Sequence, residues 1–185
     1  MPGQRDQADE LLAFWFFETR PHQWFAKDAA FDGLVRTRFL GLTRQALAGE
    51  LDAWSTSAAG CLALVLLLDQ FPRQIWRDTA MAFAGDPQAL ALSLRGVEKG
   101  WLEEEPEQAR RQFWLMPLMH SEDLTVQEAA LPLFEQFADP RTVDFARRHR
   151  DVIARFGRFP HRNAALGRVS SAEELAFLQT PGSRF

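Results

Sequence analysis

One stretch limits the possible folds of this chain more than any other: residues 58–68 contain no charged side chain. Their leucine and alanine content favours a helix over a strand. A helix that is apolar on every side must be enclosed by other elements. The stretch is also much shorter than the roughly 20 apolar residues that a membrane span requires. We therefore predict a helix at the centre of the domain and no interaction with membranes.

The rest of the chain carries helical periodicity. Apolar residues such as Phe31, Val35 and Phe39 recur at intervals of four, and no segment alternates with period two over a useful length. We predict an all-α fold: one domain over residues 1–185, with flexible tails at 1–6 and 181–185. Its antiparallel helix pairs are expected to surround the central helix. About eight helices are predicted, near residues 9–17, 28–49, 58–68, 86–100, 106–115, 122–138, 139–156 and 172–178.

Three prolines should interrupt this pattern. Pro72 disfavours helical geometry at Phe71, so the central helix is expected to end there. Pro117 is expected to end the helix before it, and Pro132 to kink another helix.

Composition narrows the possible functions. The 16 Phe and 6 Trp, with no Tyr, indicate aromatic side chains used for packing, and a formal net charge of −4 argues against general nucleic-acid binding. The single cysteine, Cys61, excludes a disulfide framework and a Cys-rich zinc site. No signal peptide is visible, so we expect a cytoplasmic protein. Motifs for phosphate loops, zinc hydrolases and serine hydrolases are missing from the sequence, and we expect no metal and no cofactor.

The most distinctive polar segment lies at residues 155–168, where Gly157 and Pro160 rule out a continuous helix. Its polar side chains gather in a turn between aromatic residues. The planar guanidinium groups of arginine suit a carboxylate or phosphate, and histidine can act as acid, base or hydrogen-bond donor. We predict an anion-binding turn; the alternative is a turn in which these side chains only hold backbone groups. The candidate residues are Arg158, His161, Arg162 and Asn163.

A second polar group, Asp69, Gln70 and Arg73, directly follows the apolar run. A carboxylate at the end of an apolar helix loses its hydration and needs a partner. We expect Asp69 to pair with an arginine of residues 155–168 or with His161, and such a pair would orient the partner for acid–base chemistry. The alternative is a buried ion pair that fixes helix register.

Other candidate site residues are His120 and Glu122, at a predicted helix start capped by Ser121, and Trp24 with Lys27, in a loop. If the turns converge, Asp69, His120, Glu122 and His161 would offer metal ligands, but their scattered positions make this the weaker interpretation.

Five blocks of sequence, at residues 14–16, 24–32, 60–73, 116–122 and 155–163, occur together in a recognisable order. The last block, which ends in Gly-Arg-Phe-Pro-His-Arg-Asn, is the most specific. In this order the blocks resemble the bacterial family known as domain of unknown function 924. The resemblance implies a tetratricopeptide-repeat-like α-α superhelix and implies no activity. The chain departs from the family pattern around residues 74–78.

Three hypotheses for function follow from the residues. In the first, the chain is a helical module that binds a small anionic ligand or a peptide at an Arg/His/Asp cleft. In the second, it is an enzyme in which His161 is the acid or base, Asp69 orients it, and Arg73 or Arg162 holds an anionic substrate. In the third, the polar cluster is closed and purely structural. The sequence does not indicate an oligomeric state.

Overall fold

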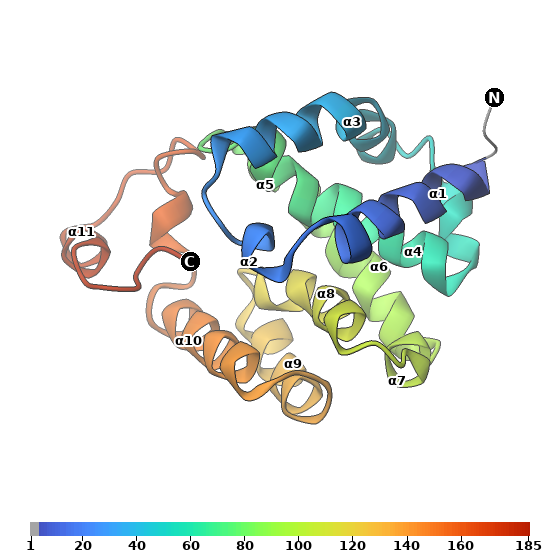
Figure 1. The fold of residues 1–185 in the computed structure, drawn as a ribbon. Helices are drawn as coiled ribbons and strands as arrows, with labels where there is room; N and C mark the ends of the chain where they lie inside the picture. The colour runs from blue at the N-terminus through green and yellow to red at the C-terminus, as the bar shows by residue number, and fades with distance from the viewer. Residues whose placement is uncertain (1–3) are drawn as a thin grey trace.

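The computed structural model describes residues 4–185, and every regular element within that range is helical (Figure 1). This confirms the all-α prediction. The α-helices are α1 (Gln4–Ala13), α2 (Pro21–Trp24), α3 (Ala29–Leu47), α4 (Ala58–Val65), α5 (Phe71–Ile75), α6 (Asp86–Glu98), α7 (Trp101–Glu104), α8 (Gln108–Met119), α9 (Leu124–Phe137), α10 (Pro140–Phe156) and α11 (Ala172–Leu178). Shorter turns are π-helical, η1 (Phe14–Glu18) and η3 (Leu66–Gln70), or 3-10, η2 (Asp52–Thr56), η4 (Ala80–Phe83) and η5 (Pro160–Arg162).

The apolar run forms the centre of the domain, as predicted. Residues 60–68 are all buried, and α4 packs against α1, α6 and α8. In Figure 1, α3 lies on one side of this centre and α9 and α10 lie on the other. Helices α8, α9 and α10 pack in succession through short links. Their arrangement as a tetratricopeptide-repeat-like superhelix stays a prediction.

The central helix does not end at Pro72, which corrects the sequence-based expectation. Phe71 has helical backbone angles (φ −64°, ψ −38°), and its N–H bonds to the carbonyl of Leu66, five residues back. This wider π-helical spacing gives the proline ring room beside the preceding turn, where an α-helix would clash. Asp69 and Gln70 therefore lie inside a continuous helical rod that runs from α4 through η3 into α5.

The expected stop at Pro117 is also wrong, because α8 continues through this proline to Met119 and His120 is its C-cap. Residues 113–119 are buried, so packing outweighs the local preference. Helix α9 then begins at Leu124. Its N-cap is Asp123, whose Oδ1 accepts from the Thr125 N–H at 2.8 Å, and not Ser121.

The predicted N-terminal tail is shorter than expected, and the predicted C-terminal tail is packed against the domain. Helix α1 begins at Gln4, inside the predicted tail 1–6, and residues 1–3 lie outside the described residues. At the other end, Ser183 is buried and the Phe185 ring lies 3.7 Å from the ring of His149, centre to centre. The chain end thus packs against α10 and next to the site described below (Figure 1).

Within residues 4–185, no helix combines the length and the apolar composition needed to cross a bilayer.

Candidate functional site

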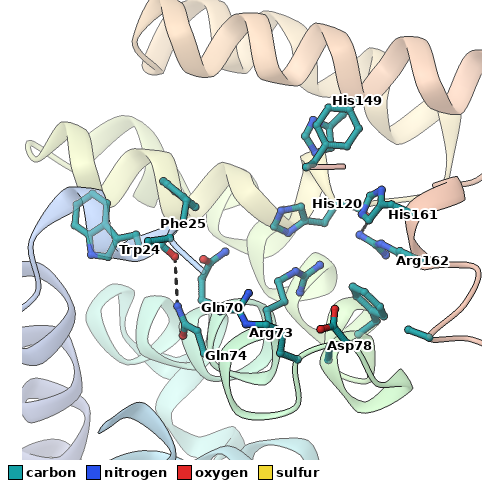
Figure 2. A pocket seen from close by; sticks show the side chains of 16 residues that line it. Trp24, Phe25, Gln70, Arg73, Gln74, Asp78, His120, His149, His161 and Arg162 are labelled. Atoms are coloured by element: carbon teal, nitrogen blue, oxygen red, sulfur yellow. Dashed lines mark hydrogen bonds between the residues drawn. The ribbon is translucent and has the colours of Figure 1, made fainter. Parts of the chain in front are cut away.

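A pocket of about 260 Å³ opens beside the end of the central rod (Figure 2). It brings together the turn after α2, the segment from η3 to η4, the C-terminal end of α8, one side of α10, and η5. The convergence of three distant polar turns, after the central helix, before α9 and at η5, is therefore present in the structure. The lining residues are Trp24, Phe25, Ala26, Gln70, Arg73, Gln74, Arg77, Asp78, Ala82, Phe83, His120, His149, His161, Arg162, Ala165 and Phe185.

Asp69 lies behind the pocket wall and is fully buried. Its Oδ1 is 2.7 Å from Nδ1 of His120, and its Oδ2 accepts from the side-chain amide of Gln70 at 2.6 Å. The Arg73 guanidinium lies 3.5 Å from Oδ1. The predicted Asp69–His161 pair is not formed. The histidine at the C-cap of α8, and not the one in η5, reaches the carboxylate.

The charge states in this group follow from burial and from hydrogen bonds. Burial alone raises the pKa of Asp69, but His120, Arg73 and Gln70 outweigh it and hold the pKa well below its usual range. Burial lowers the pKa of His120, and the attraction of Asp69 does not fully offset that effect. The arrangement is thus an ionised carboxylate facing a neutral imidazole. Nδ1 of His120 must then carry the proton that it donates to Asp69.

Two arginines converge on Asp86 at the wall of the pocket. Arg73 donates from Nη1 and Nη2 to the two carboxylate oxygens of Asp86 at 2.8 and 3.0 Å. Arg162 donates from Nη1 to Oδ2 of the same carboxylate at 2.9 Å and from Nη2 to the backbone carbonyl of His120, also at 2.9 Å. One carboxylate therefore joins η5 to α5 and α6.

The Arg162 guanidinium is held between two aromatic rings, 4.6 Å from the centre of Phe83 and 4.8 Å from that of Phe159. Its side chain is only 7% exposed. Burial, followed by the like charge of Arg73, lowers its pKa to about 10, so it stays cationic at neutral pH. Its buried Nε has no hydrogen-bond partner within the described part of the chain.

His161 lines the pocket, but no carboxylate orients it. Burial, followed by the charges of Arg162 and Arg73, lowers its pKa to about 3, and the ring is neutral. Its Nδ1 is buried, and none of residues 4–185 bonds to it. The predicted role of His161 as an acid or base therefore loses the partner on which it depended.

His149, a buried residue of α10, also contributes to the pocket wall. Its Nδ1 lies 2.7 Å from the carbonyl of Phe145, one helical turn back, which leaves Nε2 as the acceptor. Burial, followed by the nearby His120, lowers its pKa well below the usual value. The ring centres of His120 and His149 are 6.3 Å apart.

Trp24 forms the opposite end of the pocket (Figure 2). Its indole Nε1 donates to the carbonyl of Trp15 at 2.9 Å, and its own carbonyl accepts from the Gln74 amide at 3.3 Å. The ring packs 5.0 Å from Phe113, centre to centre. Trp24 thus serves both as a core side chain and as an apolar wall.

Two predicted ligand-binding residues instead hold the η5 turn. Glu122 accepts from the Phe159 N–H at 2.7 Å and pairs with Arg168 at 2.7 and 2.9 Å. Arg158 forms two bonds to Glu174, at 2.7 and 2.8 Å. Neither Glu122 nor Arg158 lines the pocket, which corrects their assignment.

The same correction applies to Asn163 and Lys27. Asn163 donates to Ser170 at 3.1 Å and accepts from Arg168 at 2.9 Å, so it also closes the turn. Lys27 lies on the surface, 3.4 Å from Asp78 at the pocket edge.

The structure also contains site residues that the sequence did not reveal. Asp86 was interpreted only as a helix start before Pro87, and nothing in its local sequence indicates that it pairs with two distant arginines. Phe83 and Phe185 were counted with the packing aromatics. The alternative that Asp69, His120, Glu122 and His161 bind a metal is not supported. No group of three His, Cys, Asp or Glu side chains in the described range is placed to hold an ion.

Comparison with known proteins places the chain in a family. It matches the bacterial family described as protein of unknown function (DUF924) over residues 11–182. A solved structure of a protein of unknown function from Agrobacterium tumefaciens is 38% identical, with a TM-score of 0.89 and coverage of 96% of this chain and 99% of that chain. No curated protein matches. The chain thus belongs to the bacterial DUF924 family.

Proposed function

We propose that the pocket binds a small anionic ligand. The observation that carries the proposal is the placement of Arg162. Its guanidinium is buried, shares a single carboxylate with Arg73, and keeps an Nε without a partner among the described residues. A buried guanidinium with an unused donor favours an ionised oxygen acceptor, because charge-assisted hydrogen bonds are about twice as strong as neutral ones.

The electrostatics of the neighbouring groups support an anion. Burial lowers the pKa of His161, and the positive charges of Arg162 and Arg73 lower it further. The charge of Arg73 likewise lowers that of Arg162. Two cationic guanidinium groups therefore lie at this wall, and they share the single carboxylate of Asp86. An anion bound there would be attracted by the same two guanidinium charges that, after burial, lower the pKa of His161.

The size of the pocket favours a small molecule over a peptide. Its volume of about 260 Å³ lies just below the roughly 300–1,000 Å³ typical of ligand sites. Arg73, His120 and Arg162 form its polar wall, and the rings of Trp24 and Phe83 form the apolar walls. A compact ligand with one anionic group and a short carbon skeleton suits this lining.

Thermal unfolding with a panel of small carboxylates and phosphates tests the proposal. A ligand at a hundred times its Kd stabilises the folded state by about 2.7 kcal/mol. For a chain of this size, about 2–4 °C per kcal/mol gives a rise in Tm of roughly 5–11 °C.

The matched variants are Arg162→Met and Arg158→Met, which remove one arginine each from the same turn, inside and outside the pocket. Arg162→Met leaves Asp86 paired with Arg73, so the fold should persist. We expect Arg162→Met to lose the response to the anion and Arg158→Met to keep it. Absence of stabilisation by any anion, or an unchanged response in Arg162→Met, would overturn the proposal.

A further inference from the structure

We infer that His120, held by Asp69, is the proton acceptor of this pocket, and that its ligand carries a hydroxyl group beside the anionic group. The inference rests on the proposed anion site and adds to it a catalytic group and a substrate class. It replaces the pairing of Asp69 with His161 that the sequence had suggested.

The argument begins with the proton on His120. Asp69 is ionised and already accepts from Gln70 at 2.6 Å. Its second oxygen, 2.7 Å from Nδ1 of His120, needs a donor, so Nδ1 is protonated. In the neutral ring, Nε2 then has a free lone pair, and no residue in the range 4–185 donates to it. Because His120 lines the pocket, that lone pair is available to a ligand.

Two further acceptors lie at the same pocket. His149 uses Nδ1 for the Phe145 carbonyl, so its Nε2 is an acceptor. Gln70 uses its amide nitrogen for Asp69, so its Oε1 is an acceptor. Figure 2 shows His120 close to both Arg73 and Arg162, and Arg162 donates to the backbone carbonyl of His120 at 2.9 Å. The pocket therefore matches a molecule that carries an anionic group with a hydrogen-bond donor beside it.

A hydroxyl is the hydrogen-bond donor that suits these acceptors. An ammonium group would be repelled by the guanidinium groups of Arg73 and Arg162, which line the pocket, whereas a neutral hydroxyl carries no such penalty. Small hydroxycarboxylic acids and hydroxyalkyl phosphates combine the two features.

The dyad formed by Asp69 and His120 also permits proton transfer. The O–H bond of the ligand breaks, an N–H bond forms at Nε2, and the electron pair stays on the oxygen. Asp69 stabilises the resulting imidazolium and fixes its orientation. Asp69 is therefore a positioning residue, and His120 is the general base. Of the three histidines in the lining, His120 is the one held by a carboxylate, and this arrangement supports acid–base chemistry. His161 has no carboxylate behind it and does not offer the same stabilisation.

The protonation state is tested by nitrogen-15 NMR of the imidazole side chains in the full-length protein. We expect His120 to carry its proton on Nδ1 in the wild type. In Asp69→Asn, the Gln70 amide still needs the side-chain oxygen, so the new amide N–H faces Nδ1 and the proton moves to Nε2. A wild-type His120 protonated on Nε2, or the same tautomer in both proteins, would overturn the dyad.

Matched ligand pairs test the substrate class. Calorimetry would compare malate with succinate and lactate with propionate, which differ only by a hydroxyl. We expect the hydroxylated member of at least one pair to bind several-fold to about tenfold more tightly to the wild type. The variant His120→Asn keeps a donor for Asp69 but lacks the Nε2 acceptor. It should bind both members of the pair with the affinity of the non-hydroxylated one, whereas His22→Asn on the surface should behave as wild type.

The outcomes separate the two proposals. Equal affinities within both pairs, or an unchanged preference in His120→Asn, would overturn this inference and leave the anion site standing. If none of the four acids binds while phosphates stabilise the protein, glycerol phosphate and propyl phosphate form the deciding pair. If no anion binds at all, the proposed function fails, and the hydroxyl part of this inference fails with it.

Discussion

Replacing Asp86 with asparagine isolates the interaction on which the pocket wall depends. The Asp86 carboxylate forms three bonds to Arg73 and Arg162, between 2.8 and 3.0 Å, and its side chain is only 16% exposed. The substitution keeps the shape of the side chain but leaves the buried guanidinium of Arg162 and the partly buried guanidinium of Arg73 without their shared anion. Breaking a buried ion pair in this way typically costs about 3–5 kcal/mol. For a chain of this size the Tm should fall by roughly 6–20 °C.

Urea unfolding followed by tryptophan fluorescence measures the loss. The control is Glu135→Gln, which removes a surface pair with Arg147 whose side chains are about half exposed. We expect the control to leave the midpoint nearly unchanged. In Asp86→Asn, adding Arg162→Met should recover part of the lost stability, because it removes the repulsion between the two arginines. A loss in Asp86→Asn no larger than that of the control would refute the charge balance that we assign to this wall.

Three further predictions concern the groups around the pocket. His161 has a pKa near 3 in the folded state and near 6.5 when unfolded, so the unfolded chain binds the extra proton as the pH falls. Between pH 7 and 5 the wild type should therefore lose up to about 2 kcal/mol more stability than His161→Gln in urea titrations, and parallel losses would contradict this. Glu122→Ala leaves the buried Phe159 N–H without its acceptor and should lower the free energy of unfolding by about 1–3 kcal/mol. This loss should appear as a lower urea midpoint. An unchanged midpoint would count against the role of Glu122 in holding η5. Trp24→Phe removes the indole donor to the Trp15 carbonyl and should lower the free energy of unfolding by about 1 kcal/mol in the same assay. An unchanged free energy would show that this hydrogen bond contributes nothing to stability.

Much of the fold follows from local sequence. Asp139, which directly precedes Pro140, caps α10 through bonds to the N–H groups of Arg141 and Thr142. Ser171 and Glu174 form a capping box at the start of α11. These features depend on residues within one turn of each other, so the sequence contains all the information needed.

The prolines show where local rules fail. Pro72 and Pro117 were predicted to end helices, yet both lie within helical rods whose neighbouring residues are buried. In the central rod, a π-helical turn provides the room that the proline ring needs. Packing of the flanking apolar residues decides between the two outcomes, and the local sequence does not contain that contribution.

The site was predictable in part. Asp69, Gln70, Arg73, His120, His161 and Arg162 were all identified as candidates, and all line the pocket or lie directly behind its wall. The partner of Asp69 was not predictable, because the choice between His120 and His161 depends on where α8 ends. That end lies beyond Pro117, where we had expected the helix to be interrupted.

The central claim is that an anion binds at Arg162 and donates a hydrogen bond to His120. Nitrogen-15 NMR can follow the Arg162 Nε–H and the His120 Nε2 signals while malate is added. The account predicts that both shift along one saturating curve, while the Nε–H of Arg158, which is bonded to Glu174 outside the pocket, stays in place. Signals of Arg162 and His120 that do not move, or that move no more than that of Arg158, would contradict the claim.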